Sequence, residues 1–135
     1  MIFKTKKIER SVTLTKESQD GILSYCKMNH PDEMVLILKG KSKKGNVLVE
    51  SLVIPPFSET GPTFAGFPSS FLPLDLSYIG MAHSHPEGSA DPSLEDLNNF
   101  FGLVSVIVKS PYKEEDIFAW DSSGNAIPIS VTENT

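Results

Sequence analysis

The segment AHSHPEGSADPSLED (residues 82–96) places two histidines directly after the apolar run Tyr78–Ala82. Such a run is typical of a strand buried in a sheet, so we expect the histidines at the end of that strand. Residues two apart on a strand point to the same side of the sheet. The imidazoles of His83 and His85 can therefore converge on one ion.

The same segment predicts a third ligand. Prolines and a glycine after His85 turn the chain back, and a helix beginning near Ser93 brings in Asp96. Two imidazoles and a carboxylate, without a thiolate, suit a zinc ion that leaves its fourth position to water, as in catalytic rather than structural sites. A second interpretation stays open, because the four residues from Ser93 to Asp96 nearly match a capping box and the segment can then be a structural turn. Spacing alone does not decide between the two.

The whole pattern, HSHP (83–86) followed by a turn and SLED (93–96), resembles the signature of the JAMM, or MPN-plus, metalloproteases. That family also has a glutamate ahead of an apolar strand that ends in glycine, and PDEMVLILKG (31–40) is similar to that segment. The resemblance implies Glu33 as general acid/base and Ser93 as the hydroxyl that stabilises the oxyanion. It also implies one zinc ion per chain, held by His83, His85 and Asp96.

The resemblance covers nearly the whole chain and implies an α/β fold. The expected architecture is a single MPN (cytidine-deaminase-like) domain over residues 1–135, in which helices flank a central mixed β-sheet. The implied activity is cleavage of a peptide or isopeptide bond after the C-terminal tail of a ubiquitin-like protein, or of a sulfur-carrier protein of the same fold. In carrying no accessory domain, the chain is similar to the stand-alone prokaryotic members. Two alternatives are a catalytically silent MPN interaction module and a zinc hydrolase of an unrelated amide.

Composition narrows the class of protein. A chain of 135 residues with 39% hydrophobic and 21% charged residues is typical of one globular domain. The net charge of −5 argues against a nucleic-acid binder, which needs a basic surface to neutralise phosphates. No apolar run approaches the roughly 20 residues needed to span a membrane. A single cysteine, Cys26, and an N-terminus unlike a signal peptide lead us to expect a cytoplasmic protein.

Hydrophobic periodicity predicts the elements around the site. We expect a helix from Lys16 to about Met28, capped by Thr15, and a second helix from Ser93 that continues until Gly102 closes it. Pro128 should make the last strand an edge. The expected strands are 11–14, 34–38 and 47–54 (joined by a turn at Gly45 and Asn46), 78–82, 103–108, 117–120 and 126–131.

Residues 55–73 are rich in proline, glycine and phenylalanine, which predicts a long loop. This loop is either a substrate-contacting flap or a plain covering for the core. Many members of the resembled family place a sizeable helix between this region and the histidine strand, but only residues 74–77 are available for it here. This departure from the family pattern affects what the resemblance implies about substrate recognition, and it leaves the expected metal site unchanged.

Four predictions concern single side chains or one helix face. We expect Cys26 and Trp120 in the core, because free cysteines and indoles bury well. We expect His30, next to Pro31, to be a turn or capping residue. On the second helix, one face should contact the core through Leu94, Leu97 and Phe101.

Overall fold

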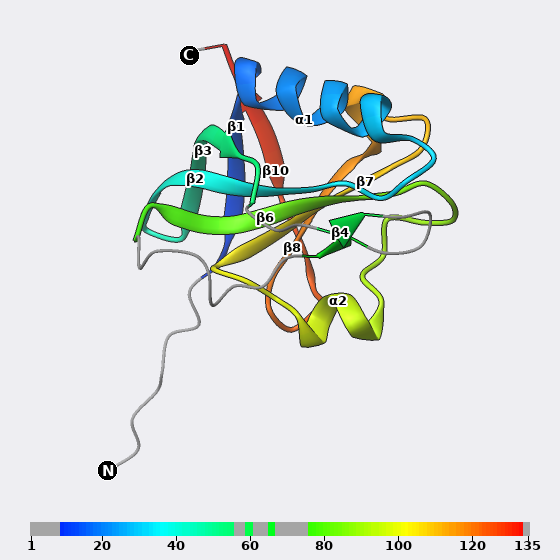
Figure 1. The fold of residues 1–135 in the computed structure, drawn as a ribbon. Helices are drawn as coiled ribbons and strands as arrows, with labels where there is room; N and C mark the ends of the chain where they lie inside the picture. Colours follow the sequence, from blue (N-terminus) through cyan, green and yellow to red (C-terminus); the bar gives the residue numbers. More distant parts are fainter. Residues whose placement is uncertain (1–8, 56–58, 61–64, 67–75, 134–135) are drawn as a thin grey trace.

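The computed structural model describes residues 9–55, 59–60, 65–66 and 76–133. Two helices and ten strands lie in these ranges (Figure 1). The helices are α1 (Lys16–Asn29) and α2 (Leu94–Asn98), and a 3-10 turn occupies Glu114–Asp116. The strands are β1 (Ser11–Thr15), β2 (Val35–Lys43), β3 (Asn46–Val53), β4 (Glu59–Thr60), β5 (Ala65–Gly66), β6 (Tyr78–His85), β7 (Val104–Lys109), β8 (Ile117–Trp120), β9 (Ala126–Ile127) and β10 (Ile129–Thr132).

Eight of the strands form one mixed sheet in the order β10-β1-β3-β2-β6-β7-β8-β9. The strand that carries the two histidines, β6, lies inside this sheet, antiparallel to β2 and parallel to β7. Two parallel neighbours need a crossover connection. The crossover from β6 to β7 contains α2, which brings that helix to the carboxyl end of β6. The mixed sheet and its flanking helices confirm the predicted fold class.

The last predicted strand, 126–131, is divided in two. Ala126 and Ile127 pair with β8, whereas Ile129 to Thr132 pair with β1 at the opposite end of the sheet. Only Pro128 separates β9 from β10, so the sheet curls until its two edges meet there. The Pro128 carbonyl accepts a hydrogen bond from the amide of Val12 (2.8 Å), while proline itself has no N–H to donate. Both pieces are edge strands, as the proline predicted.

The core fills the side of the sheet that α1 covers. Thr15 caps α1 by accepting a hydrogen bond from the Ser18 amide, as expected. The helix buries Ile22, Leu23 and Cys26 against apolar residues of the central strands. Among these are Leu36, Leu38, Ala82, Val104, Val106 and Val108. Because side chains alternate along a strand, His83 points to the opposite face of the sheet from its neighbour Ala82.

The second helix is shorter than predicted. It ends at Asn98, and the Asn99 side chain donates a hydrogen bond to the Glu95 carbonyl (3.0 Å). Asparagine favours helix ends because its amide competes for such backbone groups. Gly102, with φ +76°, lies beyond the helix and packs against the backbone of Ile79, so it does not close α2.

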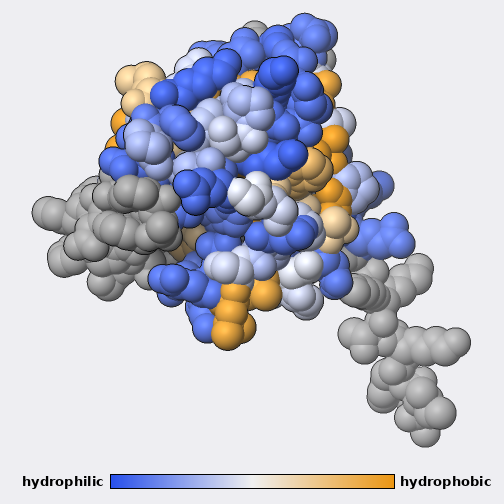
Figure 2. All heavy atoms as spheres, turned by 90° about the vertical axis from the view of Figure 1, so that its right-hand side faces the viewer, coloured by the Kyte–Doolittle hydropathy of each residue, from blue (hydrophilic) through white to orange (hydrophobic). Residues whose placement is uncertain are grey.

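The predicted core face of α2 is wrong at its first residue. Leu94 is 75% exposed, and Figure 2 shows apolar atoms at the lower end of the molecular surface, where α2 lies in Figure 1. Leu97 is half-buried and lies close to Gly124, in the turn between β8 and β9. Phe101 lies outside the helix altogether. The short helix α2 lies in the connection between β6 and β7 and buries none of its residues. The hydrophobic periodicity of the sequence did not predict this.

The β2–β3 hairpin also differs from its prediction. Strand β2 continues to Lys43, beyond the predicted 34–38. The turn lies at Lys44 and Gly45, with φ of 52° and 87°. Two consecutive residues with positive φ suit a two-residue hairpin turn. Asn46 therefore begins β3 instead of completing the turn.

Much of the predicted loop 55–73 lies outside the described residues. Within it, the two short strands β4 and β5 pair antiparallel as a separate small sheet. Neither helix in the described part of the chain has the length and apolar character needed to cross a bilayer.

Gly80 allows β6 and β7 to approach closely. A Cβ at this position would lie 2.2 Å from the Val104 carbonyl oxygen. We expect Gly80→Ala to lower the free energy of unfolding by about 3 kcal/mol or more, because backbone atoms must move. The matched control is Gly88→Ala, where a Cβ meets nothing within 4 Å and only its φ of +80° is unfavourable, at about 1 kcal/mol. Urea unfolding compares the two, and equal losses would contradict the contact as the cause.

Candidate metal centre

His83 and His85 lie at the end of β6 and share one face of the sheet. Their ring centroids are 5.1 Å apart. His83 is 4% exposed and is flanked in the sheet by Val35 of β2 and Ile107 of β7. Neighbouring strands on both sides fix the backbone from which these imidazoles project.

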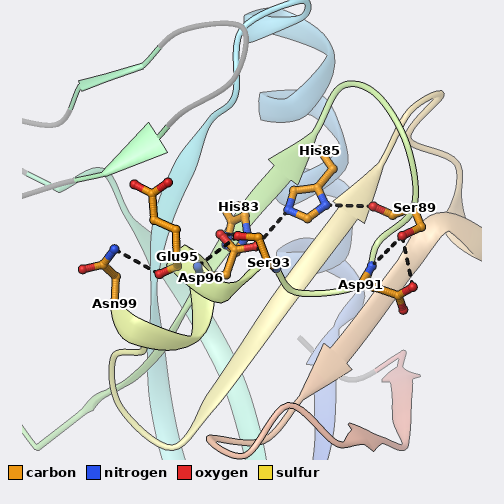
Figure 3. A network of polar contacts seen from close by, with 8 residues as sticks. All are labelled: His83, His85, Ser89, Asp91, Ser93, Glu95, Asp96 and Asn99. Atoms are coloured by element: carbon orange, nitrogen blue, oxygen red, sulfur yellow. Dashed lines mark hydrogen bonds and ion pairs between the residues drawn. The ribbon is translucent and has the colours of Figure 1, made fainter.

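Asp96 reaches the histidines from the first turn of α2 (Figure 3). Its Oδ1 lies 3.3 Å from His83 Nε2, and its Oδ2 lies 3.1 Å from His85 Nε2. The same Oδ2 accepts a hydrogen bond from the Ser93 amide (2.9 Å), while Ser93 Oγ accepts one from the Asp96 amide (3.0 Å). The segment is therefore a capping box, as the second interpretation expected, and it also brings three possible metal ligands together.

The ligand atoms are close enough to share one ion. One nitrogen from each of His83 and His85 and one oxygen of Asp96 all lie within 4.8 Å of one another. Both ring nitrogens of His83 are buried and neither makes a hydrogen bond among the described residues, because the 3.3 Å contact of Nε2 with Asp96 Oδ1 lacks hydrogen-bond geometry. Buried polar atoms are rarely left in that state. A bound cation would satisfy the nitrogen that faces Asp96.

The hydrogen bond of His85 to the turn prepares its other nitrogen for a ligand role. His85 Nδ1 lies 2.8 Å from the Ser89 carbonyl, which can only accept, so Nδ1 carries the hydrogen. Metal-bound histidines commonly donate their second N–H in this way. In the metal-free protein, only a doubly protonated His85 can also donate from Nε2 to Asp96. A cation at this point would take the place of that proton.

The pKa values reflect the same contacts. Burial by itself lowers the pKa of His85, but the hydrogen bond to Asp96 and that to the Ser89 carbonyl outweigh burial and raise it above 6.5. Burial likewise raises the pKa of Asp96, but its interactions with His83 and His85 outweigh burial and hold it well below 3.8. The carboxylate of Asp96 is thus ionised at neutral pH, as a ligand of a cation must be.

Glu33 lies two residues before β2, the strand that pairs with the histidine strand. Val35, two residues on, pairs with His83. Burial raises the pKa of Glu33 to about 7, the positive charge on His85 opposes this, and the negative charges of Asp96 and Glu95 add to it. These interactions place the Glu33 carboxyl within electrostatic range of the cluster. A general base works best with a pKa near the operating pH.

The raised pKa of Glu33 predicts that the free energy of unfolding of the metal-free protein falls as pH rises. Because the folded pKa, about 7, lies above the ordinary 4.5, Glu33 favours the fold at low pH and loses that contribution as pH rises through 7. Glu33→Gln removes the titration. We expect the variant to match wild type at pH 5 and to exceed its free energy of unfolding at pH 8 by on the order of 1 kcal/mol, since solvent screens a half-buried charge. Urea unfolding in EDTA at both pH values measures the difference, and a constant difference would contradict the shift.

Ser84, which the sequence analysis did not single out, ties the Glu33 segment to the histidine strand. It is fully buried, and its Oγ accepts a hydrogen bond from the Met34 amide (2.9 Å). The Ser84 amide also donates to the Met34 carbonyl (3.2 Å). The sequence held a signal for this, because a serine between two outward-facing histidines must point into the core, where a hydroxyl needs a partner.

The other predictions on single residues have mixed outcomes. Cys26 is fully buried, and burial raises the pKa of its thiol to about 12, which suits a core residue and not a nucleophile. His30 caps the end of α1, as expected, and its Nδ1 lies 2.7 Å from the Tyr112 hydroxyl. Trp120 is only half-buried and is not part of the core cluster, so its predicted place was wrong.

Comparisons with known proteins agree with this geometry. The family model for prokaryotic homologues of the JAB domain matches residues 15–123. A probable metalloprotease of Haloferax volcanii is 29% identical over 140 residues, which cover 98% of this chain and 84% of the relative.

Solved structures show the same fold. A JAB1/MPN domain protein from Archaeoglobus fulgidus superposes with a TM-score of 0.68 at 28% identity, over 90% of this chain and 99% of its own. A structure described as JAMM, a metalloprotease-like zinc site in the proteasome and signalosome, gives 0.66 at 26% identity, over 94% of this chain and 100% of its own. The match of the family model to most of the sequence shows that this chain belongs to the prokaryotic homologues of the JAB domain, in the JAMM/MPN family.

Proposed function

We propose that the chain is a zinc-dependent peptidase or isopeptidase that cleaves after the C-terminal tail of a ubiquitin-like modifier or a sulfur-carrier protein. The observation that carries the hydrolytic part is the meeting of His83, His85 and Asp96, with the Glu33 carboxyl in electrostatic range of them. The likeness to a probable metalloprotease supports the same reaction class. The choice of a ubiquitin-like tail comes from the family resemblance, and the cytoplasmic location stays a prediction.

The residues divide the chemistry between them. One zinc ion per chain, held by the two histidines and Asp96, would supply a Lewis acid and make a water molecule more acidic. Glu33 accepts the proton of the attacking water and passes it to the departing amine. Ser93 Oγ accepts from the Asp96 amide, which leaves its O–H free to donate to the oxyanion.

An extended tail suits a site at the end of a sheet. Such a tail can add as a strand beside an exposed edge, where backbone hydrogen bonds hold it. The tail residues next to the cleaved bond would have to be small, because that bond must reach the ligand cluster. This binding mode and the identity of the modifier are part of the proposal.

The test is cleavage of a ubiquitin-like protein fused through its C-terminal tail to a reporter. We expect release of the reporter by zinc-loaded protein, loss of release with a chelator, and none from Asp96→Ala. A protein that holds zinc but cleaves only an unrelated amide would contradict the substrate. A protein that binds the modifier without zinc or cleavage would instead be an interaction module.

Ser93→Ala separates the capping role from the catalytic one. Losing the cap of α2 should lower the free energy of unfolding by about 1 kcal/mol. Losing the oxyanion donor should also lower kcat by roughly a hundredfold or more. Ser93→Thr keeps a hydroxyl and is the matched control for both. If Ser93→Ala loses only stability in urea unfolding and keeps its rate, Ser93 is a helix cap and nothing more.

A further inference from the structure

Glu33 is carried by a short segment, residues 30–34, that connects α1 to β2. Its two ends are held by different parts of the fold, whereas the Glu33 side chain makes no hydrogen bond to any residue in the described ranges. The position of its carboxyl group therefore depends on how firmly the two ends are fixed.

At the far end, Met34 is tied to β6. Its amide donates to Ser84 Oγ and its carbonyl accepts from the Ser84 amide, at 2.9 and 3.2 Å. Both residues are fully buried, so water does not compete for these bonds. This end moves with the strand that carries the histidines.

At the near end, the His30 ring is tied to Tyr112. The Nδ1–hydroxyl distance is 2.7 Å, and the rings meet edge to face with centroids 5.5 Å apart. Tyr112 lies between β7 and the 3-10 turn, 82 residues from His30 along the chain, and is 3% exposed. Since its hydroxyl lies in the interior, a Tyr112 without this partner would hold a buried polar group unsatisfied.

The backbone of Tyr112 supports a role beyond packing. Its φ is +66°, in the left-handed region that a residue with a Cβ rarely adopts. Backbone strain of this kind persists where the surrounding structure requires it, and it is concentrated near functional sites. Burial raises the pKa of Tyr112, and the charges of Cys26 and then Glu33 add to it, so Glu33 and Tyr112 lie within electrostatic range.

We propose that Tyr112 is a positioning residue: by holding the His30 ring, it fixes the near end of segment 30–34 and keeps Glu33 aimed at the ligand cluster. Tyr112 touches neither the ion nor the substrate, and it acts through His30 alone. Its catalytic consequence rests on the proposed function, in which Glu33 is the general base. The tether, meaning the hydrogen bond between His30 and Tyr112 that fixes the near end of segment 30–34, does not rest on the proposed function and can be tested separately.

The first arm of the test is hydrogen exchange on the zinc-loaded full chain. Tyr112→Phe removes only the hydroxyl, and His30→Ala removes its partner. In both variants we expect the hydrogen-bonded amides of Asp32 and Met34 to exchange about tenfold faster, with β6 and β7 unchanged. His30→Asn offers an amide N–H at nearly the position of Nδ1 and should restore slow exchange. Tyr25→Phe, which removes a hydroxyl from α1, is the matched control and should change nothing.

The second arm is kinetic and uses the same reporter fusion. Tyr112→Phe should lower kcat by about tenfold to a hundredfold, with KM within a factor of two and zinc still bound one per chain. In a Glu33→Gln background the same change should cost no further rate. An unaltered exchange at residues 32 and 34, faster exchange throughout the sheet, or an equal loss of rate in both backgrounds would each overturn the proposal. If wild type cleaves no fusion, the proposed function fails, and the exchange arm still decides whether the tether exists.

Discussion

Glu33→Gln is expected to keep the bound metal and to lower kcat by about a hundredfold to ten-thousandfold. Glutamine has the shape of glutamate but cannot accept a proton from water or return it to the departing amine, and general acid–base catalysis contributes about that much. The metal should stay because Glu33 is not one of the three candidate ligands that meet at the end of β6. The loss should therefore be confined to the chemical step.

The measurement pairs metal analysis with steady-state kinetics on the reporter fusion. Glu95→Gln is the matched control, because Glu95 also lies within electrostatic range of the site but is exposed on α2. We expect this control to keep its rate within a few-fold. Full turnover by Glu33→Gln would remove the general-base role, and an equal loss in Glu95→Gln would point to overall charge instead.

Asp96→Ala is expected to abolish metal binding and turnover together. Asp96 faces both imidazoles and is also the third residue of the capping box, so its loss affects the ligands and the start of α2. Even outer contacts of a metal site are worth about 10- to 100-fold in affinity, so removing a ligand should cost at least about 100-fold. Without the carboxylate, the Ser93 amide also loses its partner.

Two further variants separate these effects. Asp96→Asn keeps an oxygen that can accept from the Ser93 amide, so it should lose the metal while retaining most of the helix cap. Glu87→Gln changes an exposed carboxylate in the same turn and should alter neither property. Isothermal titration with zinc and urea unfolding follow affinity and stability separately. If Asp96→Asn binds zinc as tightly as wild type, the ion lies elsewhere.

Part of the site could be predicted from local rules. The alternation of a strand places His83 and His85 on one face, and turn residues followed by a helix cap bring Asp96 back to them. The choice of Glu33 needed the family pattern, because nothing in its own spacing distinguishes it from other carboxylates. The structure adds the reason for its position, which is the bond between Met34 and Ser84.

What local rules missed depends on contacts distant in the sequence. The end of α2 is the exception, because the Asn99 side chain bonds the carbonyl of Glu95 only four residues away, where the sequence analysis had chosen Gly102. The division of the last strand at Pro128 follows from the curl of the whole sheet, which a single strand does not reveal. The contact between His30 and Tyr112 joins residues 82 apart, so neither residue predicted the other.

The central claim is that His83, His85 and Asp96 hold one metal ion, and metal analysis tests it most directly. Protein purified without added zinc should contain about one zinc ion per chain by elemental analysis, should lose it to a chelator, and should carry none after His83→Ala. Wild-type protein that cannot take up zinc, or a His83→Ala variant with its full share of metal, would contradict the account.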